Sequence, residues 1–94
     1  MEITEIKIVP CDKGQLRGYI TITMDNCFVI SELKLIRSKK GYFVHMPQKK
    51  RADGTYLDIV APITAEARKM LEERVLAEYE KIAGEPVKRR EVKQ

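Results

Sequence analysis

Alternating apolar and polar residues along the first two thirds of the chain predict a series of short β-strands. The clearest alternation is GYITITM, residues 18–24, where isoleucine and methionine share one face with glycine, and tyrosine and threonine occupy the other. This pattern is typical of a strand with one buried and one solvated face. Less regular segments, rich in β-branched or aromatic residues, predict four further strands at 2–9, 27–36, 42–46 and 55–60.

The predicted strand at 27–36 changes its alternation part-way along. Two early apolar residues share one parity, and two later leucines share the other. A β-bulge near Ser31 and Glu32 reconciles the two halves, because one extra residue shifts the side-chain phase.

Turn-forming residues separate the predicted strands. They form the turns Asp12–Gly14 and Asp25–Asn26, the basic turn RSKKG at 37–41 and the loop QKKRADG at 48–54. Pro47 ends the fourth strand, because proline cannot donate a hydrogen bond to a central ladder.

The apolar period becomes helical after Pro62. Thr64 is suited to an N-cap, and Gly84 is suited to a C-terminal stop. Four apolar residues at helical spacing predict the stripe that faces the sheet: Leu71, Val75, Tyr79 and Ile82. Leu76 is predicted to point nearly opposite this stripe, which hints at a second contact.

These elements predict an α+β architecture, with an antiparallel sheet of about five short strands and a C-terminal helix packed on one face. The predicted domain spans residues 1–83, and residues 84–94 are predicted to form a loose basic tail. A sheet of this kind has exposed edges, and a chain of 94 residues has only a modest core. Both features favour pairing with a second copy, so a homodimer is expected.

Composition narrows the class of protein. A hydrophobic fraction of 44% supports a folded chain. No apolar run approaches the roughly 20 residues of a membrane span, and the N-terminus lacks the pattern of a signal peptide. We therefore expect a cytoplasmic protein with no membrane contact. Cys11 and Cys27 are expected to be reduced and metal-free, with Cys27 in the core.

Catalytic groups are sparse in this sequence. His45, the single histidine, is predicted to lie on a polar or half-buried strand face. No nucleophile motif, phosphate-binding glycine loop or zinc-ligand spacing is present. Asp58 could act as a general base, although a hydrogen bond to a neighbouring loop or an arginine is its more ordinary role. We expect no enzyme activity, no cofactor and no small-molecule substrate.

The charge distribution is more informative. The chain carries a net charge of +4, and residues 34–51 hold seven basic residues and no acidic one, which leaves a net charge of −3 for the rest. Such asymmetry indicates an anionic partner, or else a solvated basic segment without one.

Two basic clusters flank the predicted strand at 42–46. Lys39 and Lys40 precede it, and Lys49, Lys50 and Arg51 follow it. Consecutive turns fall at opposite ends of a strand, about 17 Å apart here, so the clusters are expected to flank the strand rather than merge.

A third cluster, residues 88–90, lies in the predicted tail. Lysine and arginine side chains on loops can reach phosphates, which makes nucleic acid the expected partner. Aromatic side chains near these clusters could stack on bases if they are exposed: Tyr42, Phe43 and Tyr56.

Residues 41–63, GYFVHMPQKKRADGTYLDIVAPI, closely resemble the signature region of the SpoVG family of stage V sporulation and septation proteins. The family pattern has a Gly-x-Phe-Val/Ile-x-Met-Pro core, a short basic loop, an Asp/Asn-Gly turn, then Asp-Ile and Pro-Ile. The matching positions are Gly41, Phe43, Val44, Met46, Pro47, Lys49, Lys50, Gly54, Asp58, Ile59, Pro62 and Ile63. The resemblance extends over about residues 1–83.

The sequence departs from the family pattern in the basic loop. Gln48 stands where serine is usual, Lys50 stands where arginine is common, and Arg51 adds a charge at a usually neutral position. Ala61 replaces a residue that is often histidine or an aromatic. Because arginine and lysine present their donors differently, a preference for DNA or RNA does not carry over.

The resemblance implies a small cytoplasmic bacterial dimer without enzyme activity. It implies binding to DNA, and in some members RNA, with effects on sporulation, septation or gene expression. The implied binding residues fall on the basic loop after Met-Pro, here Lys49 and Lys50. The alternative is a protein-interaction module in cell division that uses the sheet edge or Leu76.

Overall fold

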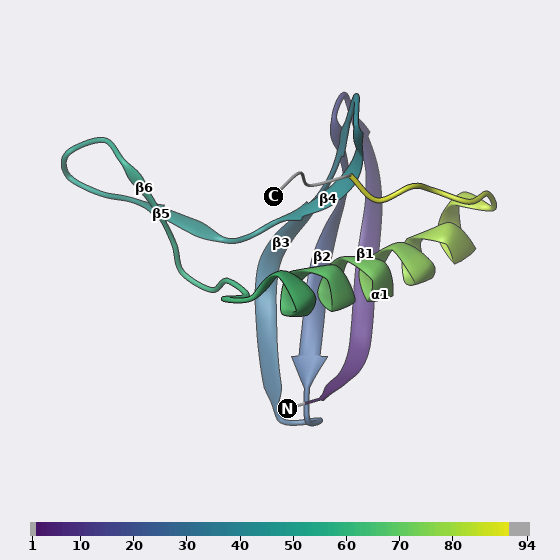
Figure 1. The fold of residues 1–94 in the computed structure, drawn as a ribbon, viewed down its shortest axis with the longest axis horizontal. Coiled ribbons are helices and arrows are strands. Elements are labelled where there is room, and N and C mark those ends of the chain that lie inside the picture. Colours follow the sequence, from purple (N-terminus) through teal and green to yellow (C-terminus); the bar gives the residue numbers. More distant parts are fainter. Residues whose placement is uncertain (1, 91–94) are drawn as a thin grey trace.

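The computed structural model describes residues 2–90, which form an antiparallel four-stranded sheet, a separate two-stranded ribbon and one helix (Figure 1). The sheet is a meander in the order β1-β2-β3-β4. Its strands and the other elements are β1 (Ile3–Lys13), β2 (Leu16–Met24), β3 (Phe28–Ser38), β4 (Gly41–His45), β5 (Gln48–Lys50), β6 (Tyr56–Asp58) and α1 (Ala65–Ala83). The predicted α+β class is confirmed.

The fifth predicted strand does not join the main sheet. The structure pairs β6 with β5, a segment that the sequence assigned to a loop, and this two-stranded ribbon leaves the sheet as an arm (Figure 1). Pro47 explains the departure, because it has no N–H with which to continue the ladder of β4. Its carbonyl instead accepts a hydrogen bond from the Ile59 N–H at 2.8 Å, which closes the base of the arm.

The predicted bulge in β3 is confirmed. Between the pairs Ile20–Leu33 and Ile22–Ile30, β3 contains one residue more than β2. Glu32 adopts a positive φ of 65° there, a conformation that few non-glycine residues take. The bulge keeps apolar residues of both halves of β3 on the side of the helix.

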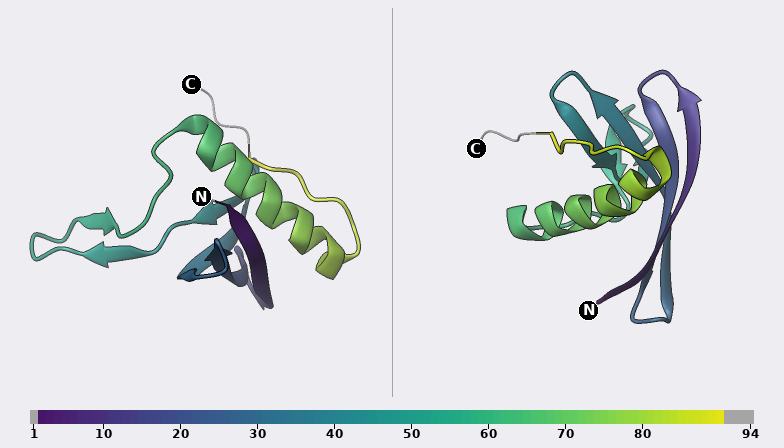
Figure 2. Two further views of the ribbon diagram at one scale, coloured as in Figure 1. Left: turned by 90° about the horizontal axis from the view of Figure 1, so that it is seen from below. Right: turned by 90° about the vertical axis from the view of Figure 1, so that its right-hand side faces the viewer.

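The helix begins and ends where its caps were predicted. The Thr64 side chain accepts a hydrogen bond from the Ala67 N–H at 3.0 Å, and Gly84 ends the helix in the left-handed conformation with φ 74°. The helix covers one face of the sheet, and no other helix of residues 2–90 covers the opposite face (Figure 2).

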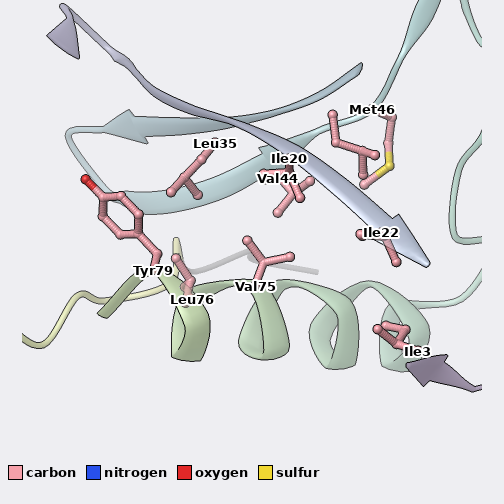
Figure 3. Packing of buried hydrophobic residues seen from close by; sticks show 10 residues of the cluster. Ile3, Ile20, Ile22, Leu35, Val44, Met46, Val75, Leu76 and Tyr79 are labelled. Carbon is pink, nitrogen blue, oxygen red and sulfur yellow. The ribbon is translucent and has the colours of Figure 1, made fainter. Parts of the chain in front are cut away.

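The core lies between α1 and the sheet (Figure 3). Its buried hydrophobic residues are Ile3, Ile20, Ile22, Leu33, Leu35, Val44, Met46, Val75, Leu76 and Tyr79. The predicted helix stripe is therefore rotated: Leu76 is 5% exposed, whereas Ile82 is 48% exposed. The last turn of α1, which contains Ile82, extends past β1 (Figure 1). Leu76 points at the sheet beside Tyr79 (Figure 3). The idea that Leu76 forms an external contact is wrong.

Both cysteines have free thiols in the structure. Cys27 is exposed in the β2–β3 turn rather than buried, because the strand begins one residue later, at Phe28. The placement of Cys27 in the core is wrong.

Residues 87–90 run along β4 and are called the C-terminal strap. The Tyr42 N–H donates to the Lys88 carbonyl oxygen at 2.8 Å, and the Arg90 N–H donates to the Tyr42 carbonyl oxygen at 2.7 Å. Val87 packs against the core. The sequence predicted a loose tail for residues 84–94, but the strap is held against the sheet; residues 91–94 lie outside the described part of the chain.

Gly41 and Glu72 also contribute to the position of the strap. Gly41 has φ 126°, and a Cβ there would lie 2.7 Å from the Lys88 carbonyl oxygen, closer than real Cβ atoms approach. Glu72, which is 1% exposed, accepts from the Val44 N–H and from Arg89 Nε, both at 2.9 Å. One carboxylate thus joins the helix, the edge strand β4 and the strap. The strap also occupies the edge of β4 at Tyr42, where a second chain could otherwise pair.

Candidate nucleic-acid interface

The basic arm, residues 48–58, carries the principal predicted site. Lys49 and Lys50 lie on β5, and Arg51 begins the turn between β5 and β6. All three residues are exposed, and none of their side chains forms an ion pair with another residue of the described chain, 2–90. Their positive charges are therefore available to a partner.

The turn of the arm is fixed by its own residues. The Arg51 N–H donates to the Thr55 carbonyl oxygen at 2.7 Å, and the Gly54 N–H donates to the Arg51 carbonyl oxygen at 3.0 Å. Gly54 has φ 90°, a conformation that favours glycine. Asp53 Oδ1 accepts from the hydroxyl and the N–H of Thr55 at 2.6 and 3.0 Å. The hydrogen bond from the Thr55 hydroxyl, and after it the one from the Thr55 N–H, lower the pKa of Asp53 below its ordinary value, because both stabilise the ionised carboxylate.

The second acidic residue of the arm, Asp58, also binds a neighbour. Its Oδ1 accepts a hydrogen bond from Gln48 Nε2 at 2.7 Å, across the first pair of the ribbon. Asp58 is thus a structural residue at the base of the arm, partnered by a side chain rather than by the loop backbone or arginine that the sequence suggested. Within residues 2–90, neither acid of the arm forms an ion pair with its basic residues.

The consecutive lysines of the arm point in opposite directions. Lys49 pairs with Leu57, and Lys50 pairs with Tyr56. Directly opposed residues of an antiparallel pair share a face, and successive residues alternate between faces. Lys50 therefore shares a face with Tyr56, and Lys49 shares the other with Leu57.

Lys39 and Lys40 form the turn between β3 and β4 and are exposed. The side chain of Ser38 orders this turn, donating to the Gly41 carbonyl oxygen at 2.8 Å and accepting from the Lys40 N–H at 3.3 Å. The turn and the arm lie at opposite ends of β4 and point in different directions (Figure 1). The two basic clusters therefore lie apart, at the two ends of β4. This agrees with the prediction that they flank the strand rather than merge.

The basic residues of the strap are engaged with the domain. Arg89 Nε donates to buried Glu72, and the Arg90 guanidinium lies 3.9 Å from the centroid of the Phe43 ring. Arg89 is therefore structural, and Arg90 covers one of the aromatic residues considered for base stacking. Tyr42 is also unavailable, because its ring packs 5.7 Å from Tyr79 in the core. Tyr56 remains exposed on the arm, with 64% of its surface accessible.

A hollow of about 490 Å³ lies where the arm meets the sheet face that faces away from the helix. Its sheet side includes Tyr19, Lys34 and His45, and its arm side includes Tyr56. His45 is half-buried on β4, as predicted. Sequence reasoning missed this hollow, because its residues come from five separate strands. The polar alternation of β2 was the one available signal.

The described residues give no sign of a metal centre or a membrane span. Among residues 2–90, no three side chains of His, Cys, Asp or Glu are grouped to hold a metal ion. The helix of this part of the chain is too polar to cross a membrane. That the cysteines stay reduced and metal-free remains a prediction.

Comparison with known proteins decides the family. The SpoVG family pattern matches residues 1–81, which include the arm and the hollow. The chain belongs to the SpoVG family. The C-terminal strap lies beyond the matched SpoVG region.

Several relatives carry the same name, "Putative septation protein SpoVG". The relative from Anaeromyxobacter sp. (strain Fw109-5) is 46% identical over 81 residues, which cover 86% of this chain and 84% of that protein. The relative from Myxococcus xanthus (strain DK1622) is 47% identical over 81 residues, with 86% and 82% coverage. The SpoVG protein of Phytoplasma australiense is 36% identical over 88 residues, covering 93% of this chain and 92% of its own.

Proposed function

We propose that this SpoVG-family protein is a cytoplasmic nucleic-acid-binding regulator without enzyme activity, and that its basic arm contacts the phosphate backbone. The observation that carries the proposal is the arm itself: Lys49, Lys50 and Arg51 are exposed and unpaired within residues 2–90, on a ribbon that stands away from the domain (Figure 1). Phosphate contacts suit such side chains, because binding releases counterions from the nucleic acid. The names of the relatives support a role in septation. Effects on sporulation or gene expression, and the binding of DNA or RNA, are part of the proposal.

Replacing Lys49, Lys50 and Arg51 together by alanine should weaken binding to duplex DNA of any sequence, because phosphate contacts position a protein without reading bases. Each lost contact should flatten the slope of log K against log salt by about 0.9. The unfolding free energy should change by no more than about 0.5 kcal/mol per site, since the side chains are solvated. Fluorescence anisotropy at several salt concentrations, with a urea titration alongside, measures both effects.

A charge-matched control comes from three exposed lysines elsewhere, Lys7, Lys69 and Lys81, which form surface ion pairs with Glu5, Glu73 and Glu78. Replacing these three by alanine removes the same net charge but leaves the arm intact. If both triple variants lose affinity equally, net charge rather than the arm governs binding. An unchanged salt slope in the folded arm variant would remove the arm from the mechanism.

We also propose that the protein is a homodimer, and that the apolar segment 57–63 takes part in the interface. Leu57, Ile59 and Ile63 are 48%, 61% and 96% exposed, an unusual density of exposed aliphatic side chains for so short a stretch. The strap occupies the edge of β4 at Tyr42, so this edge is less open to a second chain. Segment 57–63 is therefore the better candidate for association.

An Ile63→Asp variant should therefore be monomeric at concentrations where the unmodified protein is dimeric, because it would place a charge in an apolar interface. Light scattering across micromolar concentrations gives the mass directly. Phe28→Asp, at a residue that is 66% exposed on β3, is the matched control and should remain dimeric. A monomeric unmodified protein would contradict the dimer, and a dimeric Ile63→Asp variant would move the interface elsewhere.

The second candidate function is a protein-interaction module of cell division. The exposed apolar segment 57–63 favours it, in place of Leu76, which is buried. Salt-sensitive binding to a generic duplex separates the two functions, since an interaction module has no reason to show it.

A further inference from the structure

The hollow between the sheet and the arm is built by strand pairing. Tyr19 pairs with Lys34 across β2 and β3, and Lys34 pairs with His45 across β3 and β4. Directly opposed residues share a face, so these three side chains form one row on the face of the sheet opposite the helix. Tyr56 of the arm lines the same hollow from the other side. The hollow thus has an aromatic ring from the sheet and another from the arm, with two nitrogen-bearing side chains between.

The polar groups of the hollow suit a planar, hydrogen-bonding ligand. Lys34 and His45 supply donors, and Glu32, brought there by the β3 bulge, supplies an acceptor. Lys13 Nζ lies 5.7 Å from the centroid of the Tyr19 ring and adds a positive charge beside the hollow. The volume of about 490 Å³ falls within the roughly 300–1,000 Å³ that is usual for small ligands.

The arm connects this hollow to the proposed phosphate contacts. Lys50 shares the face of the ribbon with Tyr56, whereas Lys49 lies on the other face. A strand whose phosphate lies against Lys50 would therefore have its base beside Tyr56. A paired base in a duplex is stacked between its neighbours and could not enter such a hollow, but an unpaired base can.

We propose that the hollow binds an unpaired base of single-stranded nucleic acid, stacked on Tyr19 or Tyr56, while the backbone of that strand runs over Lys50 of the arm. This inference rests on the proposed nucleic-acid function and makes it more specific, because it predicts a preference for single strands over duplexes. Aromatic stacking tolerates any base, so the preference is for strandedness and not for sequence.

The first experiment compares affinities for a mixed-sequence single-stranded oligonucleotide and for its duplex, as DNA and as RNA, at one salt concentration. Tyr19→Ala and Tyr56→Ala are each measured beside Tyr19→Phe and Tyr56→Phe, which keep the ring. At least one alanine variant should weaken single-strand binding at least about fivefold, the lower end of what one stacked base contributes, and should leave duplex binding unchanged. The phenylalanine variants should bind as the unmodified protein does. Phe28→Ala, at an exposed aromatic residue outside the hollow, is the matched control.

The second experiment tests the path of the strand. Lys50→Ala and Lys49→Ala remove the same charge from adjacent residues on opposite faces. Lys50→Ala should weaken single-strand binding more than Lys49→Ala does. In parallel, 2-aminopurine placed in the strand should lose fluorescence on binding the unmodified protein, and lose less on binding the affected tyrosine variant.

The outcomes separate the hollow from the arm. Suppose that binding is salt-sensitive, equally tight for single strands and duplexes, and unchanged in both tyrosine-to-alanine variants. That result would overturn base binding in the hollow and would leave the proposed function intact. A free mononucleotide that binds as tightly as the strand, or an acidic peptide that competes equally, would overturn the assignment to a strand. No binding to any nucleic acid would instead remove the proposed function itself.

Discussion

Replacing Glu72 by alanine is expected to lower the free energy of unfolding by about 3 kcal/mol. Its carboxylate is 1% exposed and accepts from the Val44 N–H and from Arg89 Nε, both at 2.9 Å, and Arg68 Nη1 lies 3.9 Å away. Alanine would leave the Val44 N–H buried without an acceptor and would remove the carboxylate that binds Arg89 of the strap. Urea denaturation, followed by circular dichroism, measures the loss.

Glu73 is the matched control for this experiment. It is the next residue of the same helix, but it is exposed, and its one ion pair within residues 2–90 is with Lys69, at 3.8 Å. Exposed ion pairs of this kind contribute about 0–1 kcal/mol, so Glu73→Ala should be nearly neutral. Equal effects of the two variants would contradict the role assigned to Glu72.

The Glu72 variant also tests what the strap does. Amide hydrogen exchange at Tyr42, whose N–H donates to Lys88, should accelerate in Glu72→Ala more than global unfolding accounts for. Duplex binding by the arm should persist in conditions where the variant is folded, because the arm makes its own turn contacts through Asp53 and Gly54. Loss of binding in the folded variant would link the strap to the interface.

The features predicted correctly from the sequence depend on local chemistry. The helix caps at Thr64 and Gly84 follow from the conformations that threonine and glycine favour at helix ends. The bulge at Glu32 follows from a phase change within one strand. The basic clusters follow from charge alone. The caps, the bulge and the clusters can all be predicted without knowing what the segment packs against.

The features predicted wrongly depend on contacts between distant segments. The strand at Tyr56–Asp58 was recognised, but its partner β5 is a polar tripeptide with no apolar alternation. The strap is held along the edge of β4 by backbone hydrogen bonds to Tyr42 and by Glu72, which looks like any other helix glutamate in the sequence. The hollow was missed for the same reason, since Tyr19, Lys34 and His45 meet through the pairing of three strands.

The helix face shows how such an error arises. Helical spacing gives the angle of each side chain around the helix axis. When a helix has many apolar residues, several neighbouring angles define an apolar stripe that could face the sheet. Which stripe is buried depends on where the helix lies over the sheet, and the sequence pattern does not record that position. The structure places the buried face around Glu72, Val75, Leu76 and Tyr79, with a carboxylate inside it.

The position of the helix face can be tested with two substitutions of the same kind, Leu76→Ala and Ile82→Ala. Leu76 is 5% exposed and packs against the sheet (Figure 3), so its truncation should leave a cavity and cost about 2–5 kcal/mol. Ile82 is 48% exposed, and its truncation should cost about 1 kcal/mol or less. Both changes replace a branched aliphatic residue with alanine in the same helix, so differences in helix propensity contribute little. Urea titrations at one fixed protein concentration keep any contribution from dimerisation equal. The face predicted from the sequence requires the opposite ranking, with Ile82→Ala the more destabilising, and that result would place the helix in a different rotation over the sheet.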